Sequence, residues 1–211
     1  MGQKINPVIF RITGGQTRWL CDWYARDKAV YERNIFEDIV ILKYLRRCAV
    51  SQYIGDVLIE RKSTTPHITI KTGKQVAIFG KKGVFLEKMQ KDIQNLIDKR
   101  PSISVSDIKK PDLVARVLGN NVANQVVKRV SYKRAVKGAI EAAMKAGALG
   151  VKVSIAGRLN GAEIARSETF KEGSMPLHTI RANINYAVVE AFSIYGVIGI
   201  KVWVHSNARM N

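Results

Sequence analysis

The chain has 211 residues and carries 35 lysine and arginine residues against 17 aspartate and glutamate residues, a formal net charge of +18. An enzyme that acts on a neutral small molecule does not need so large an excess, which instead indicates a polyanionic partner whose counterions are released on binding. Hydrophobic residues make up 46% of the sequence, enough for a buried core in one large or two small domains. No run of 18 or more apolar residues and no secretory signal occurs, so we expect nucleic acid rather than a membrane as the polyanion.

Catalytic and metal chemistry have little support in the sequence. The two cysteines, Cys21 and Cys48, lie far apart without zinc-ligand spacing, and the three histidines are scattered. We therefore expect free thiols in a reducing, cytoplasm-like compartment, with no metal and no cofactor. No nucleophile–base pair and no paired carboxylates are apparent, so the chain is not expected to be an enzyme.

Residues 1–27 are predicted to form an irregular N-terminal arm, because Pro7 and the glycine pair at 14–15 break any periodicity. Within the arm, Lys4 and Arg11 are candidates for contact with RNA. Three aromatic residues are expected to pin the arm to the core, with stacking on RNA as the alternative: Trp19, Trp23 and Tyr24.

The next segment, residues 28–108, is predicted to be a domain with the element order α-β-β-α-α-β. The helices are expected over 28–48, 76–79 and 84–99, and the strands around 57–60, 67–71 and 103–106. Both long helices show an apolar stripe at three- and four-residue spacing, formed by Ile35, Phe36, Ile39, Leu42 and Leu45 in the first and by Phe85, Met89, Ile93 and Leu96 in the second.

A glycine loop, Gly80-Lys81-Lys82-Gly83, joins the last two of these helices. It stands at a helix N-terminus, where free N–H groups and the helix dipole favour an anion, and its two lysines add positive charge. A G-x-x-G loop between helices is the phosphate clamp of KH domains, and the element order around it matches a type II KH domain. A nucleotide P-loop fits worse, because Gln75 and Lys82 stand where that motif needs glycine and a hydroxyl residue.

Pro111 marks a domain boundary near 108–112, and residues 112–206 are predicted to form an α+β domain. Its helices are expected at about 112–129 and 132–146, with Gly119-Asn120-Asn121 interrupting the first. Strands are expected around 151–155, 164–170, 184–189 and 198–204. Two helices should therefore cover one face of a mostly antiparallel four-stranded sheet.

The densest basic stretch lies between these two helices, and no acidic residue occurs from 128 to 140. Arg129, Lys133 and Lys137 are four residues apart and would share one face of a continuous helix. A solvated helix face usually mixes the signs of its charges, so we favour a patch that binds a nucleic-acid strand. Its residues are Lys128, Arg129, Lys133, Arg134 and Lys137.

A glycine-rich turn at 157–161 contains Arg158, and Arg166 follows it. These two arginines either pair with Glu163 or Glu168 or reach RNA, and the sequence favours neither role.

Five segments together resemble bacterial-type small-subunit ribosomal protein S-three. They are M-G-Q-K-I-N-P at 1–7, G-K-K-G at 80–83, G-R-L-N-G-A-E-I-A-R at 157–166, P-L-H-T-I-R-A at 176–182 and Y-G-V-I-G-I-K-V-W at 195–203. They occur in the family's order and cover nearly the whole chain, and the last three are far more specific than the glycine loop. One departure is Lys74-Gln75-Val76, where the family commonly has Arg-Pro-Gly.

The resemblance implies a structural constituent of the small ribosomal subunit. Such a protein binds 16S-type rRNA in the lower head and touches mRNA at the entrance of its channel. Ribosomal proteins S-ten and S-fourteen would pack against the C-terminal domain, with S-two, S-four and S-five nearby. By motif, the family's mRNA-entrance residues fall on Lys133, Arg134 and Lys137, and the first of these is often arginine in the family. The compartment would be the cytoplasm or the matrix or stroma of an organelle.

The alternative is a free KH-domain regulator of mRNA, which would bind selected sequences and would not associate with small subunits. A nuclease or DNA lyase is a third class. The lack of a metal-ligand set argues against a metal nuclease, whereas the sequence leaves a lysine lyase open.

Overall fold

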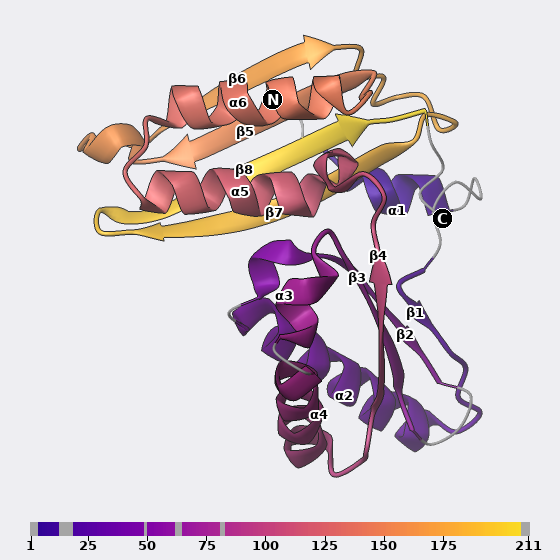
Figure 1. Ribbon diagram of the computed structural model, residues 1–211. Coiled ribbons are helices and arrows are strands. Elements are labelled where there is room, and N and C mark those ends of the chain that lie inside the picture. The colour runs from indigo at the N-terminus through magenta and orange to yellow at the C-terminus, as the bar shows by residue number, and fades with distance from the viewer. Residues whose placement is uncertain (1–3, 13–18, 49, 62–64, 81–82, 208–211) are drawn as a thin grey trace. The chain divides into compact units, whose positions relative to one another are not determined.

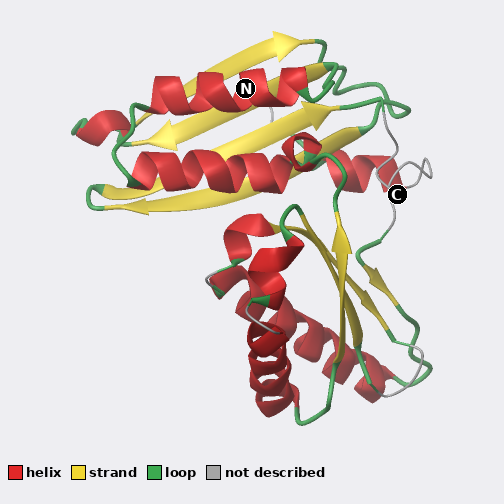
Figure 2. Cartoon of the chain, viewed as in Figure 1, coloured by secondary structure: helices red, strands yellow, loops and turns green. Residues whose placement is uncertain are grey.

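A computed structural model describes residues 4–12, 19–48, 50–61, 65–80 and 83–207 (Figure 1). The chain divides into two units. We call Trp19–Lys109 the middle unit, and Met1–Arg18 together with Lys110–Asn211 the flanking unit. Helices and strands occur in both units (Figure 2), which confirms the predicted α+β class.

The middle unit has the predicted α-β-β-α-α-β order. Its helices are α2 (Lys28–Arg47), α3 (Gln75–Phe79) and α4 (Val84–Ile97), and its strands are β2 (Ile54–Glu60), β3 (His67–Thr72) and β4 (Ser102–Asp107). A short strand that the sequence did not indicate, β1 (Cys21–Asp22), adds to the edge and gives the sheet order β1-β2-β3-β4. Strands β2 and β3 are antiparallel, whereas the two outer pairs are parallel.

The core of the middle unit lies between the sheet and helices α2 and α4. Ile41 and Leu45 of α2 and Met89 and Ile93 of α4 are buried against isoleucines of β2 and β3. The predicted stripe of α2 is therefore partly wrong, because Phe36 is 68% exposed and Ile39 is also exposed. In α4, Ile97 is buried in place of the predicted Leu96, which is exposed.

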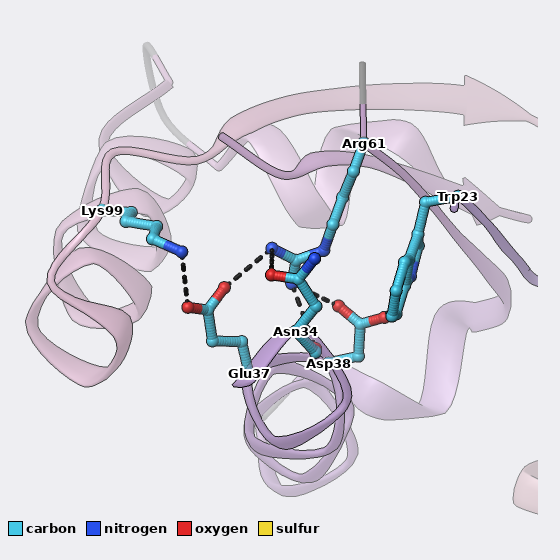
Figure 3. A network of polar contacts seen from close by, with 6 residues as sticks. All are labelled: Trp23, Asn34, Glu37, Asp38, Arg61 and Lys99. Atoms are coloured by element: carbon cyan, nitrogen blue, oxygen red, sulfur yellow. Dashed lines mark hydrogen bonds and ion pairs between the residues drawn. The ribbon is translucent and has the colours of Figure 1, made fainter. Parts of the chain in front are cut away.

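A buried polar network explains the rotation of α2. Glu37 and Asp38 point inward, and Arg61, directly after β2, donates to Glu37 Oε2 at 2.7 Å and to Asp38 Oδ1 at 2.6 Å (Figure 3). Lys99 Nζ donates to the other Glu37 oxygen at 2.6 Å, and Trp23 Nε1 donates to Asp38 Oδ2 at 2.8 Å. Two cations thus balance two carboxylates, as buried charges require.

The aromatic residues near the start of the middle unit differ in role. Trp23 is an anchor, as predicted, because its ring also lies beside Tyr31 and under the Arg61 guanidinium. Trp19 and Tyr24 are exposed and do not act as anchors.

The flanking unit confirms the predicted four-stranded antiparallel sheet. Its strands are β5 (Gly150–Gly157), β6 (Arg166–Gly173), β7 (Ile184–Ser193) and β8 (Gly196–His205), in the order β6-β5-β8-β7. Helices α5 (Ala115–Val127) and α6 (Tyr132–Lys145) cover one face (Figure 1). Helix α5 is not interrupted at Gly119. A Cβ atom on that glycine would lie 2.8 Å from Val189 Cγ2, so glycine lets α5 approach β7 closely.

The predicted irregular arm is wrong for residues 7–12, which form α1 (Pro7–Ile12). Proline suits the first turn of a helix because its missing N–H needs no partner there, and Asn6 Oδ1 accepts the Val8 N–H at 2.9 Å. Arg11 is 1% exposed, and its guanidinium donates to the carbonyls of Ala182 at 2.8 Å and Thr179 at 3.0 Å, among others. This arginine therefore fixes α1 to the 176–182 segment and is not available to RNA, contrary to the sequence-based candidate.

Gly150→Ala is expected to destabilise the flanking unit by about 2–4 kcal/mol. A Cβ atom at Gly150 would lie 2.1 Å from the backbone oxygen of Ser174, which cannot move without breaking the β5–β6 pairing. Amide hydrogen exchange in β5 and β8 measures the effect. Gly138→Ala is the control, because nothing lies within 4 Å of its Cβ position and alanine favours the helix. Equal exchange rates in both variants would contradict the prediction.

Candidate RNA interface

The glycine loop joins α3 to α4, as predicted. Gly80 ends α3 with a φ of +64°, and Gly83 precedes α4 with a φ of +80°. Residues other than glycine rarely adopt such positive φ angles, because their Cβ atom clashes with the backbone. Both positions therefore favour glycine. Lys81 and Lys82 lie outside the described residues.

Apolar side chains lie exposed on both sides of this loop. Val76 and Phe79 belong to α3, and Val84 begins α4. The described residues on either side of the loop therefore expose apolar surface.

The start of α6 carries the second group of predicted residues. Lys133, Arg134 and Lys137 are exposed and line a shallow hollow together with Ser131, Gly138 and Glu141. None of the three cations forms an ion pair or a hydrogen bond with any residue in the described ranges. Lys133 Nζ lies 6.0 Å from the centroid of the Tyr132 ring. The structure thus brings these three side chains together on one surface.

The electrostatics of this helix start are unfavourable for the isolated protein. The first turn of α6 contains no acidic residue, and Ser131 forms no side-chain cap. Cations at a helix N-terminus oppose the dipole, at a cost of about 0.3–1 kcal/mol each. An anion bound there would satisfy both the cations and the free N–H groups of the first turn.

The two helices are separate, as predicted, so Arg129 does not share a continuous helix face with Lys133 and Lys137. Helix α5 ends at Val127, and Arg129 adopts a φ of +62° in the turn before α6. Lys128 and Arg129 are exposed in this turn, so they lie beside the α6 cations in sequence but do not continue their helical row.

Tyr132 and Glu168 hold the start of α6 against β6. Sequence reasoning missed Tyr132 and considered Glu168 only as a partner for an arginine. The Tyr132 side chain is 2% exposed, and its hydroxyl donates to Glu168 Oε1 at 2.9 Å. Arg166 Nη2 donates to the same hydroxyl at 3.1 Å, and Arg166 Nε lies 3.3 Å from Glu168 Oε1. Of the two roles left open for Arg166, the pairing with Glu168 is present, while half of its side chain stays exposed.

Arg158 serves the turn that contains it. Its Nε donates to the carbonyl of Ala162 at 2.9 Å, and its guanidinium carbon lies 5.8 Å from the centroid of the Tyr195 ring. No bond to Glu163 is found in the described part of the chain. Lys4, the remaining candidate, is exposed ahead of α1.

The next findings concern metal ligands, membrane spans and cysteines among the described residues alone. They contain no group of three or more histidine, cysteine or acidic side chains arranged to hold a metal ion. No helix among them is both long and apolar enough to cross a bilayer. Cys21 and Cys48 are free thiols.

The α-β-β-α-α-β order and the glycine loop between α3 and α4 place the middle unit in the class of KH domains. The family model described as KH domain matches residues 41–113, and that described as "Ribosomal protein S3, C-terminal domain" matches residues 122–204. The chain is 43% identical over 205 residues to small ribosomal subunit protein uS3 of Ligilactobacillus salivarius, covering 97% of this chain and 93% of the relative. The proteins of the same name from Pelagibacter ubique and from Wolbachia sp. subsp. Brugia malayi are each 41% identical over 97% of this chain, and 90% and 98% of their own lengths are covered.

This chain belongs to the family of small ribosomal subunit protein uS3. The resemblance noted in the sequence is therefore confirmed, as is the prediction of a ribosomal protein rather than an enzyme.

Proposed function

We propose that the protein binds 16S-type rRNA in the lower head of the small subunit and contacts mRNA at the entrance of its channel. Lys133, Arg134 and Lys137 hold the mRNA backbone. The observation that supports this proposal is the group of three exposed cations at the start of α6. No carboxylate among the described residues forms an ion pair with any of them. Contacts to phosphates alone bind without sequence preference, as a channel that accepts every message requires.

In this proposal the chain performs no covalent chemistry. Its cations hold one strand after the helix of a structured message opens, and the movement of the ribosome supplies the work. Lys128, Arg129 and the exposed part of Arg166 extend the positive surface around the start of α6. The proposed location is the cytoplasm, or an organelle that translates its own messages.

The proposal includes protein neighbours. Ribosomal proteins S-ten and S-fourteen pack against the flanking unit, S-four and S-five stand at the mRNA entrance, and S-two lies nearby. This arrangement rests on the family resemblance.

Sedimentation of tagged protein in a sucrose gradient tests the assignment to the ribosome. We expect the chain to sediment with small subunits and to leave them only when high salt or RNase disrupts the particles. A protein found only at the top of the gradient, yet bound to selected messages, would favour the free KH-domain regulator instead.

Changing Lys81 and Lys82 together to aspartate is expected to weaken RNA binding and to reduce its salt dependence. If both lysines contact a single strand, the slope of log K against log salt falls by about 1–2, because each contact contributes about 0.7. Fluorescence anisotropy of a labelled single-stranded RNA measures this slope. The control variant carries Lys88→Asp and Lys91→Asp, which make the same charge change at exposed positions of α4. Identical slopes for the two variants would count against a clamp at the glycine loop.

A further inference from the structure

The flanking sheet has a second face, turned away from α5 and α6, and lysines gather on it. Residues alternate between the two faces along a strand, so Val151 and Val153 pack under the helices while Lys152 points the other way. Lys152 is directly opposite Lys171 of β6 and Trp203 of β8. Lys201 is two residues from Trp203 on the same face, opposite Ser154.

Lys4 joins this group from the N-terminal segment. It lies close enough to Lys152 for the two charges to repel each other. The pKa of Lys152 is lowered mainly by burial, and further by the neighbouring positive charges of Lys4 and Lys171. The N-terminal segment that carries Lys4 is held against the flanking sheet, because Arg11 of α1 donates to carbonyls of residues 176–182 and α1 contacts β7. We call Lys4, Lys152, Lys171 and Lys201 the lysine face.

This arrangement destabilises the folded chain in the absence of a partner. Like charges directly opposite each other on neighbouring strands repel, as Lys152 and Lys171 do. At the described strand positions of this face, the acidic side chain is Glu190, which is opposite Gly199 and forms no ion pair with the described lysines. A dense group of cations that the protein itself does not neutralise indicates an external polyanion.

The chemistry of the face favours contact with a nucleic-acid backbone over contact with bases. Trp203 is 9% exposed, and its ring is covered by Lys152, whose Nζ lies 5.1 Å from the ring centroid, and by Tyr186 at 5.2 Å. The indole is therefore not free to stack on a base. The exposed ring of Phe192 is also on this face, but it lies opposite Val197, four positions along β7 from the residue that pairs with Lys201. Lysine is also depleted at the centre of protein–protein interfaces, so an acidic protein segment is the weaker candidate.

We propose that the lysine face is a second RNA-binding surface, which binds backbone phosphates of the small-subunit rRNA without reading its sequence. It lies on the opposite face of the sheet from the α6 cations, so one unit holds RNA on two sides. The identity of the RNA rests on the proposed function, whereas the recognition chemistry rests on the lysine face alone.

Chemical acetylation of lysines, read by mass spectrometry, tests the occupant. Lys152, Lys171 and Lys201 should react in the free chain, be at least about tenfold protected in assembled small subunits, and react again after RNase digestion. Reactivity in intact subunits would overturn the proposal, and so would protection that survives RNase, because a protein would then cover the face. A chain that never enters small subunits would instead overturn the proposed function.

Binding by purified full-length protein provides a test that does not depend on assembly. A variant with Lys152→Gln, Lys171→Gln and Lys201→Gln should bind a transcript of the rRNA head domain with a salt slope reduced by about 2–3. The control removes the same charge at exposed positions with Lys88→Gln, Lys91→Gln and Lys145→Gln. Amide exchange in β5 confirms that the sheet of both variants is intact. Equal slopes for variant and control would overturn the proposal.

Discussion

Replacing Arg61 by methionine is expected to destabilise the middle unit by about 3–5 kcal/mol at pH 7. The Arg61 side chain is 3% exposed and bridges Glu37 and Asp38, both of which are buried. Without its guanidinium, one positive charge, that of Lys99, remains for two buried carboxylates. Methionine retains most of the packing volume, so the loss reports the charge and not a cavity. Amide exchange in α2 and β2 should accelerate roughly 10²- to 10⁴-fold.

The effect of Arg61→Met should depend on pH in a defined direction. Burial alone would raise the pKa of Glu37, but the hydrogen bonds and charges of Lys99 and Arg61 together lower it. A lowered pKa means that the ionised carboxylate stabilises the folded state above its unfolded value of about 4.3, and that this contribution is lost as pH falls below that value. The difference between Arg61→Met and the unchanged chain should therefore hold from pH 7 down to about pH 4.3 and shrink as the pH falls further.

Arg33→Met, on the exposed surface of the same helix, is the matched control and should change stability by no more than about 0.5 kcal/mol. If Arg61→Met were as mild as Arg33→Met, or if its effect were the same at about pH 3 as at pH 7, the network would not stabilise the unit in the way described.

Much of the fold follows from periodicity in the sequence. The α-β-β-α-α-β order and the four antiparallel strands were predictable because the elements have their own apolar periods and many are bounded by glycine or proline. The α6 cations were predictable as an exposed group, since Ala135, Val136 and Ile140 define the opposite, buried face of the same helix.

The features that sequence reasoning missed depend on contacts between distant residues. The rotation of α2 is set by Arg61, which lies 23 residues after Asp38, so the apolar stripe alone predicted a buried face that is partly wrong. Arg11 looked like an RNA contact because, apart from the Pro7 carbonyl, the carbonyls that accept its hydrogen bonds lie 165 or more residues away. The lysine face left a partial signal in the sequence, because Lys152 and Lys201 each lie between two buried residues of a strand. The strand register was needed to show that Lys171 is beside Lys152.

Replacing Lys133, Arg134 and Lys137 together by alanine is expected to leave subunit assembly intact and to slow translation of messages with stable hairpins by several-fold. Three phosphate contacts to a single strand correspond to a salt slope of about 2, so the variant should hold an opened strand about tenfold less tightly at moderate salt. Reconstituted translation of matched messages, with and without a stable hairpin, measures the elongation rate. The control removes three cations elsewhere with Lys88→Ala, Lys91→Ala and Lys145→Ala.

The same substitutions should make α6 more stable, which separates function from folding. Alanine is the strongest helix former, and removal of the two lysines and the arginine relieves about 0.3–1 kcal/mol of dipole repulsion for each cation in the first turn. The Tyr132 bond to Glu168 still fixes the start of the helix. A variant that exchanges its α6 amides more slowly and yet stalls on hairpins would show that the chain keeps this unfavourable arrangement for binding. Equal slowing on unstructured messages would instead contradict a role in holding separated strands.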